Sequence, residues 1–366
     1  MKKEITLFFA SLGITLLVVA GGGELVLRLR YGGTALPQEV GGGYPAHLMR
    51  PDERMGYTLT PGFRGRQIVP DHPDVELEIN RKGLRDYERE LPPSAAPIFV
   101  LGDSFTFGHG VSFEKIWPTL LENKIREENP RYFVIKAGVP GFGWRQYEAQ
   151  YRRLAPLFQR HSLVIVGFTV DAGERVAKGY EVKGGVLVKR FYPHLMVLDG
   201  LVYEKAFRSE QLNQADAFLR SRSYFFRWFN QRFFFILHRM KRTLRERRGP
   251  PLPGRDPRPL PVSRQPHIRE ALAVLDSIGK LAGTKQAKVL VLFIRHPQAW
   301  ENEVRFYQAA LSERGIPYLD LSPPDETAYL GWLLPKDWHW NEFGNREAAR
   351  LVYQFIREHK LLESVN

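Results

Sequence analysis

The sequence contains no cysteine among its 366 residues, which excludes a disulfide framework, a thiolate metal site and a cysteine nucleophile. It also lacks histidines at ligand spacing on one helix and a glycine-rich loop with lysine for cradling phosphate. We therefore expect no metal and no organic cofactor. No internal repeat is visible. What is present is a chain of 43% hydrophobic residues, enough for one large α/β domain with insertions or for two domains.

An apolar run occupies residues 5–19, after two lysines and before three glycines. Extended to residue 23, the run approaches the ~20 residues that cross a bilayer, although a signal-peptide core is the competing interpretation. Apolar residues continue at 25–29, which favours an uncleaved anchor. We expect residues 1–30 to form a membrane anchor and juxtamembrane segment, with a single pass through the inner membrane and the rest of the chain on the periplasmic side.

Residues 31–96 are rich in glycine and proline, and we expect them to form an irregular segment that wraps the domain. Within it, residues 75–79 alternate Val-Glu-Leu-Glu-Ile, the period of a half-exposed strand. Turn residues follow at 80–83. This pattern predicts an edge hairpin.

From residue 97 onward, apolar strand patterns alternate with helical patterns. This order predicts a three-layer α/β/α domain over 97–360, flavodoxin-like, with a central five-stranded parallel sheet built from right-handed crossovers. The expected strands are 98–101, 132–136, 163–168, 289–294 and 318–321, and the expected helices are 114–128, 145–158, 267–282, 298–313 and 342–359.

A long insertion at 172–265 interrupts this alternation. Residues 201–264 hold 15 Lys/Arg against 5 Asp/Glu. Most of the whole-chain net charge of +13 therefore lies in this segment. Over 218–248, aromatic and aliphatic residues follow helical spacing with arginines around them. One interpretation is a helix lying on anionic lipid, and the other is a helix packed over the sheet with a solvated basic face. No nucleic-acid-binding module is recognisable, so no nucleic-acid partner is expected.

The expected strand 98–101 ends at Gly102-Asp103-Ser104, before a helical stretch. Ser104 should therefore lie where a central strand hands over to a helix. A hydroxyl at the carboxyl end of a parallel strand is exposed in the crevice where open α/β sheets bind ligands, and nearby amide donors can stabilise an oxyanion there. The alternative is an ordinary turn in which Asp103 or Ser104 caps the helix.

A second group precedes the final helix, where Asp337 and His339 are separated by one tryptophan. A carboxylate beside a histidine can hold the imidazole in one tautomer, so that it works as a general base. The alternative is a capped loop with surface aromatics. Each candidate site residue follows a predicted strand. We therefore expect all of them to lie in one crevice at the carboxyl ends of the strands. They are Ser104, Gly138, Asp171, Arg295 with His296, and Asp337 with His339.

Taken together, these motifs resemble the SGNH (GDSL-like) hydrolase family, and more closely its bacterial branch with an N-terminal membrane anchor. The matching blocks are 102–108 (GDSFTFG), 137–141 (AGVPG), 167–171 (GFTVD) and 337–341 (DWHWN), with 80–86 (NRKGLRD) ahead of the nucleophile strand. The resemblance covers residues 55–170 and 287–356, and the basic insertion lies outside it.

The resemblance implies that Ser104 is the nucleophile, His339 the base and Asp337 its orienting carboxylate. The backbone amides of Ser104 and Gly138 would form two parts of the oxyanion hole. In the family the third part is the side-chain amide of an asparagine, whereas this sequence has Asp171. An ionised Asp171 would repel the oxyanion, so it could contribute only if burial kept it protonated.

By the same resemblance, the expected reaction is hydrolysis of a small acyl ester, most simply an acetyl group on a cell-surface or secreted carbohydrate. Two alternatives remain open: an O-acetyltransferase of polysaccharide assembly that uses the same Ser-His pair, and a non-catalytic membrane-associated binding protein. The tryptophans near the site can stack on sugars or serve as packing residues. The expected substrate-contacting residues are Asp103, Arg295, His296, Trp338 and Trp340.

Overall fold

The computed structural model describes residues 2–31, 44–45, 48–67, 69, 72–169, 180–183, 186–189, 195–198, 201–204, 209–226, 229, 266–295, 301–323, 325–335 and 337–362. The chain divides into two compact units. The smaller unit comprises 1–38 and 193–259, and the larger comprises 39–192 and 260–366. Residues 39–96 thus belong to the same unit as the predicted α/β domain, whereas part of the insertion belongs with the N-terminal helix.

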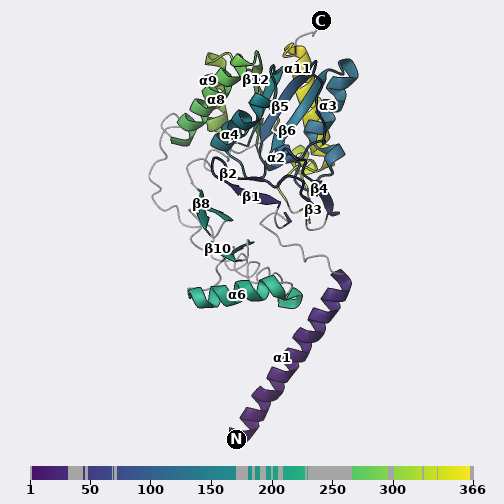
Figure 1. Ribbon diagram of the computed structural model, residues 1–366, viewed down its shortest axis with the longest axis vertical. Coiled ribbons are helices and arrows are strands. Elements are labelled where there is room, and N and C mark those ends of the chain that lie inside the picture. Colours follow the sequence, from purple (N-terminus) through teal and green to yellow (C-terminus); the bar gives the residue numbers. More distant parts are fainter. Residues whose placement is uncertain are drawn as a thin grey trace. The chain divides into compact units, whose positions relative to one another are not determined.

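A five-stranded parallel sheet forms the centre of the larger unit (Figure 1). Four of its strands are largely buried and apolar, as parallel strands covered by helices must be, whereas the short edge strand over 318–320 is partly exposed. The chain places its second strand on one side of the first and its third on the other, so the strand order reverses beside β5. The predicted α/β fold with a parallel five-stranded sheet is confirmed. In spatial order the strands are β13 (Tyr318–Asp320), β12 (Lys288–Ile294), β7 (Leu163–Thr169), β5 (Ala96–Gly102) and β6 (Tyr132–Gly138).

Helices cover both faces of this sheet (Figure 1). Alternate residues of β5 enter different cores: Ile98 and Val100 pack in one cluster, Phe99 and Leu101 in the other. Each helix buries one apolar stripe against its face of the sheet. The first cluster lies under α3 (Trp117–Glu128) and α11 (Glu342–Glu358), and the second under α4 (Trp144–Leu154), α8 (Pro266–Thr284) and α9 (Glu301–Glu313).

Two antiparallel strand pairs precede the sheet: β1 (Met49–Asp52) with β2 (Gly56–Leu59), and β3 (Arg64–Gln67) with β4 (Val75–Glu78). The predicted strand over 75–79 therefore forms, with alternate residues buried as expected. A hairpin forms here, although its pairing differs from the one that the turn at 80–83 suggested. β4 pairs with the strand before it, in a two-stranded sheet apart from the central one, and the turn at 80–83 joins no second strand to it.

The larger unit also contains the pair β8 (Tyr180–Lys183) and β9 (Val186–Lys189), together with the short helix α10 (Glu326–Gly331). β8 and β9 fall inside the predicted insertion. They pair with each other and not with the central sheet. The insertion thus leaves the order of the five central strands undisturbed.

The smaller unit contains α1 (Lys2–Tyr31), the strand pair β10 (Leu195–Leu198) and β11 (Leu201–Glu204), and α6 (Glu210–Arg222). Within this unit α1 contacts the insertion. The carboxylate of Glu24 accepts hydrogen bonds of 2.8 Å from the Ser223 hydroxyl and from the backbone N–H of Phe225. The ring of Phe225 lies against Gly23, where any side chain would collide with it. Of the basic aromatic helix predicted over 218–248, residues 227–228 and 230–248 lie outside the described residues.

Residues 2–31 form a helix, but among the described residues no helix has both the length and the apolar composition needed to cross a membrane. The membrane span predicted over 5–23 is therefore not confirmed by the structure.

Candidate active site

Ser104 begins the short helix α2 (Ser104–Phe107) immediately after β5 ends. Asp103 caps this helix, because its Oδ1 accepts the N–H of Phe105 at 3.0 Å. As the first helical residue, Ser104 has an N–H that no helical carbonyl can accept. Gly102 has no room for a side chain, since a Cβ there would overlap the Thr106 side chain. The strand therefore turns sharply into the helix, and the serine lies at the sheet's carboxyl edge.

A buried arginine supports the other end of this helix. The guanidinium of Arg85 donates to the carbonyl oxygens of Phe107, Gly108 and Val111 at 2.8–2.9 Å, and positive charge at a helix C-terminus is favourable. Burial lowers the pKa of Arg85 to about 10, so it remains a cation at neutral pH. Arg85 lies in the 80–86 block, which gives that part of the family resemblance a physical role.

Asp337 and His339 lie in a tight loop between α10 and α11. The loop is closed by backbone hydrogen bonds from Leu334 N to the His339 oxygen at 2.9 Å and from Asp337 N to the Leu334 oxygen at 3.2 Å. Asn341 caps α11 through the N–H of Gly344 at 2.9 Å. The carboxylate Oδ1 of Asp337 accepts the His339 backbone N–H at 2.8 Å. This local bonding fixes the carboxylate beside the imidazole.

The two motifs meet in a single hydrogen-bonded chain. His339 Nδ1 lies 2.5 Å from Oδ1 of Asp337, and Nε2 lies 2.8 Å from the Ser104 hydroxyl. Burial opposes ionisation of Asp337, but hydrogen bonds from His109 and His339 outweigh it and hold the pKa well below its usual range. An ionised Asp337 can only accept a hydrogen bond, so the proton of the neutral His339 ring lies on Nδ1. Nε2 then carries the lone pair that can accept the serine proton. This arrangement can activate a hydroxyl nucleophile.

Gly138 lies at the same edge as the serine. It ends β6 and pairs in register with Gly102 of β5. A Cβ at position 138 would come within 2.6 Å of the Phe107 backbone nitrogen, so the absence of a side chain allows β6 to approach α2. Asp171 lies outside the described residues, so its place in the oxyanion hole, like that of the two amides, stays a prediction.

Asp103 has a different place from the one expected of a substrate-contacting residue. Its side chain is completely buried. One carboxylate oxygen caps α2 and the other accepts the hydroxyl proton of Thr169 at the end of β7. The helix-capping alternative fits this geometry, because a carboxylate engaged on both oxygens and shielded from solvent cannot reach a substrate.

The other residues predicted to contact the substrate differ in how far their side chains are exposed. Trp340 is 3% exposed and packs edge-on against Phe105, so it is a core residue. Trp338, next to His339 in the chain, is 67% exposed. The guanidinium of Arg295 donates to Oδ2 of Asp320 at 2.9 Å, which ties the ends of β12 and β13 together. His296 lies outside the described residues.

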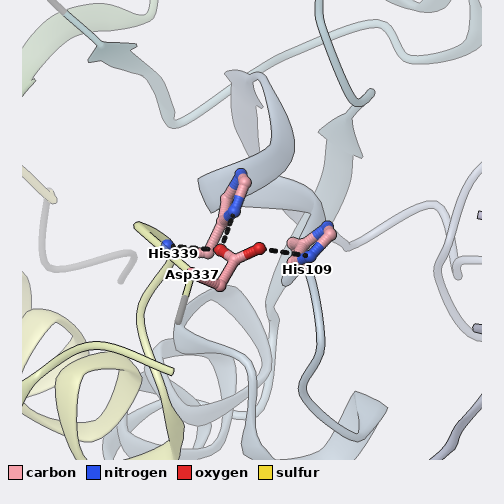
Figure 2. A group of neighbouring side chains, drawn as sticks. All are labelled: His109, Asp337 and His339. Carbon is pink, nitrogen blue, oxygen red and sulfur yellow. Dashed lines mark hydrogen bonds and ion pairs between the residues drawn. The ribbon is translucent and has the colours of Figure 1, made fainter. Parts of the chain in front are cut away.

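Sequence reasoning missed His109, which lies against Asp337 and His339 (Figure 2). Its Nε2 is 3.5 Å from Oδ2 of Asp337, and its ring stacks on that of His339. The available signal was its place one residue after the nucleophile block 102–108, next to the glycine that ends α2. One donor atom from each of the three residues lies within 4.8 Å of the others, a spacing that could also hold a metal ion.

A cavity of about 1000 Å³ opens elsewhere in the larger unit. Its lining includes Ala96, Tyr132 and Ser162, which lie at or next to the amino ends of β5, β6 and β7. Ser104 lies at the opposite, carboxyl edge of the same strands. This cavity is therefore separate from Ser104, Asp337 and His339.

The sequence matches no family model and no curated protein sequence. Several solved structures are similar in fold. TesA shares 14% identity over 73% of this chain and 99% of its own, with a TM-score of 0.41. A member of the lipolytic protein G-D-S-L family from Veillonella parvula shares 13% identity over 72% and 99%, with a TM-score of 0.40. A two-domain esterase active on acetylated mannans shares 13% identity over 73% and 50%, with a TM-score of 0.39.

Proposed function

We propose that this chain is a serine ester hydrolase of the SGNH type that acts on small acyl esters. The observation that carries the proposal is the continuous set of contacts from the Ser104 hydroxyl to His339 and on to the carboxylate of Asp337, at 2.8 and 2.5 Å. The three groups come from two of the sequence blocks that carry the family resemblance, 102–108 and 337–341. They meet at the carboxyl edge of a parallel sheet, where α/β proteins bind ligands.

In the proposed reaction, the Ser104 oxygen attacks the ester carbonyl while His339 Nε2 accepts the hydroxyl proton. The negative oxygen of the tetrahedral intermediate would be stabilised by the backbone amides of Ser104 and Gly138. His339 then donates the proton to the departing alcohol, which leaves an acyl-serine. Water activated by the same nitrogen releases the acid and restores the serine, while Asp337 stabilises the imidazolium in both halves.

Labelling with a serine-directed fluorophosphonate tests this proposal. We expect the protein to label at Ser104 and to hydrolyse p-nitrophenyl acetate, and we expect Ser104→Ala to lose both properties. Ser112→Ala is the matched control, because the Ser112 side chain makes no capping hydrogen bond at the nearby 3₁₀ turn and should behave as the parent. A parent protein that neither labels nor turns over would contradict the proposal and favour the non-catalytic alternative.

The proposed substrate is an acetyl ester on a carbohydrate. Trp144 and Trp340 are buried, whereas Trp338, next to His339 in the chain, is exposed. An exposed indole beside the proposed base suits stacking on a sugar ring. Trp338→Ala should therefore raise KM for an acetylated oligosaccharide while leaving turnover of p-nitrophenyl acetate unchanged. Equal effects on both substrates would argue against carbohydrate binding through this side chain.

Product analysis tells hydrolysis from acyl transfer. With acetylated saccharide as donor, we expect free acetate to form at the same rate with and without an unacetylated saccharide acceptor. Acetyl groups appearing on the acceptor instead would favour the O-acetyltransferase alternative. Both reactions use the same acyl-serine, so the identity of the second nucleophile decides between them.

We further propose that the chain works on the outer side of the inner membrane, with the membrane and an acylated carbohydrate as its partners. The support for a membrane partner is the apolar run 5–23 and the basic, aromatic composition of 218–248, whereas Arg28 and Arg30 oppose Lys2 and Lys3, so charge leaves the orientation to the test. A basic segment of this composition suits anionic lipid.

A further inference from the structure

The carboxylate of Asp337 is shared between two histidines (Figure 2). Oδ1 contacts Nδ1 of His339, and Oδ2 lies 3.5 Å from Nε2 of His109. The two imidazole rings stack with centroids 4.0 Å apart and planes 23° apart. Each oxygen of the catalytic carboxylate thus has its own ring nitrogen, and one face of the His339 ring is covered by His109.

His109 is tied to the nucleophile by the end of α2. Gly108, at a φ of 83°, ends the helix in the left-handed conformation that glycine tolerates. The backbone N–H groups of Gly108 and His109 both donate to the Ser104 carbonyl oxygen at 3.0 Å. One turn of chain therefore sets the positions of both the nucleophile and the second histidine.

The hydrogen bonds of His109 define which nitrogen carries its proton. The backbone N–H of Gly110 donates to Oε1 of Gln67 at 3.0 Å, which turns the amide nitrogen of Gln67 toward Nδ1 of His109, 2.9 Å away. The Tyr44 hydroxyl is 2.7 Å from the same nitrogen. The amide nitrogen of Gln67 can only donate, so Nδ1 presents its one lone pair to these groups, and the proton resides on Nε2, which faces Asp337.

The surroundings keep His109 neutral. Its side chain is 2% exposed. Burial lowers its pKa, and the nearby charges of His339 and Arg85 act in the same direction, while Asp337 opposes them. A neutral His109 presents an N–H to the carboxylate without placing a second positive charge beside the imidazolium that forms at His339.

Tyr44 is also held in its protonated form. Burial raises its pKa well above the usual range, with the negative charge of Asp103 acting in the same direction. Its ring packs edge-on against His109 with centroids 5.0 Å apart. The phenol therefore keeps its proton at neutral pH and can donate a hydrogen bond to Nδ1 of His109.

A metal ion bound by His109, Asp337 and His339 is the competing interpretation of this group. The nearly parallel rings disfavour it, because the lone pairs of stacked imidazoles run side by side, whereas metal ligands converge on one point. Each carboxylate oxygen also already faces a ring nitrogen. Hydrogen bonding and stacking account for the group without an ion.

We propose that His109 is a positioning residue for the esterase reaction: its Nε2–H steadies the carboxylate of Asp337, and its ring holds the plane of the His339 imidazole. The inference rests on the proposed function, because a positioning residue has meaning only if Ser104 and His339 are catalytic. His109 acts through its two neighbours and not on the substrate. If the Nε2–H of His109 were removed, the carboxylate of Asp337 would interact more strongly with the protonated ring of His339. The acid limb of the pH–rate profile would then move to higher pH.

Two substitutions separate the parts of this proposal. His109→Phe keeps an aromatic ring against His339 and removes the donor, and His109→Gln restores an N–H without the ring. With p-nitrophenyl acetate we expect His109→Phe to lower kcat roughly tenfold with KM unchanged, and to move the acid limb upward. His109→Gln should return the limb to its original pH. An unmoved limb in His109→Phe, or equal losses in both variants, would overturn the proposal in favour of plain packing.

Nitrogen NMR of the histidine-labelled full-length protein tests the geometry without any substitution. We expect His109 as the neutral tautomer protonated on Nε2 between pH 6 and 8, and a proton found on Nδ1 would overturn the proposal. Activity should survive dialysis against EDTA, and its loss would favour the metal interpretation. Failure of the proposed function shows separately, as an unlabelled Ser104 in the parent protein, and leaves the NMR measurement of His109 interpretable.

Discussion

The Ser104 hydroxyl lies 2.8 Å from Nε2 of His339, although the two residues are 235 positions apart in the chain. Ser104 lies on the turn from β5 into α2, and His339 lies on the loop that precedes α11. Neither segment alone determines the contact between them. The contact exists because both elements end at the same edge of the central sheet.

Asp337→Asn should lower turnover of p-nitrophenyl acetate by about 10³–10⁴-fold without unfolding the protein, because an amide stabilises neither the productive tautomer nor the imidazolium of His339. Steady-state kinetics and circular dichroism check this result. Asp325→Asn is the control from the same region, since Asp325 caps α10 through the N–H of Ala328 at 2.8 Å and asparagine caps equally well. A rate unchanged in Asp337→Asn would mean that this carboxylate does not orient the base.

Asp171→Asn tests the departure from the family pattern. An ionised carboxylate beside the oxyanion opposes the developing charge, so activity should fall at high pH, while the need for a neutral His339 makes it fall at low pH. The parent should show a bell-shaped profile. The asparagine variant should show higher turnover and no fall at high pH, because it carries a neutral donor of the same shape. If the substitution alters neither rate nor profile, Asp171 lies outside the site.

Gly138→Ala should lower kcat by about 10² or more, because its Cβ would press on the Phe107 backbone nitrogen and displace the helix that carries Ser104. Gly279→Ala is the matched control. It lies within α8 with nothing near its added methyl group, so activity should persist and stability should rise by roughly 0.5–1 kcal/mol. Kinetics and thermal unfolding of both variants provide the comparison. Normal turnover in Gly138→Ala would show that β6 and α2 can separate without harm.

His161 should make the protein less stable in mild acid. Its Nε2 faces the Ala155 carbonyl and its Nδ1 the Tyr151 hydroxyl, and burial lowers its pKa to about 4 from the usual 6.5. The unfolded chain therefore binds a proton that the folded protein does not between these values, so stability falls as the pH drops from 6.5 toward 4, by at most about 3 kcal/mol.

His161→Gln removes this dependence while keeping a donor toward Ala155. Urea unfolding at pH 7.5, 5.5 and 4.5 should show a parent that loses stability faster than the variant, with the gap between them closing in acid. The depressed pKa of Asp337 acts only at lower pH, because that carboxylate is ionised in both states above its usual range. Parallel curves for the two proteins would contradict the prediction.

The location can be checked in spheroplasts. If the chain works outside the cytoplasm, external protease should digest residues 97–360 in intact spheroplasts, and the protein should sediment with membranes. Carbonate washing and the mass of the mature N-terminus then distinguish an anchor from a cleaved signal that leaves a chain beginning near residue 21–25. Protection from external protease would contradict the proposed location.

The local pattern of apolar and polar residues was sufficient to predict the central strands and the helices between them. The five strands appear within a few residues of the predicted ranges, because a strand buried on both faces must be apolar throughout and therefore stands out in the sequence. Pairing was harder. The alternation over 75–79 indicated a strand but not its partner, since period two reports which face is buried and says nothing of which neighbour supplies the hydrogen bonds.

By itself, the sequence determined the order of strands and helices, the ends of the strands, and therefore the edge at which Ser104, Gly138 and the Asp337–His339 pair would gather. Only the tertiary structure decided which of these side chains are buried and which contacts they make. It buried Asp103 and Trp340, left Trp338 exposed, and placed His109 against the carboxylate of Asp337. The physical reason is that burial and hydrogen-bond partners depend on which distant segments meet. Periodicity along a chain records only the face that each residue turns to its own element.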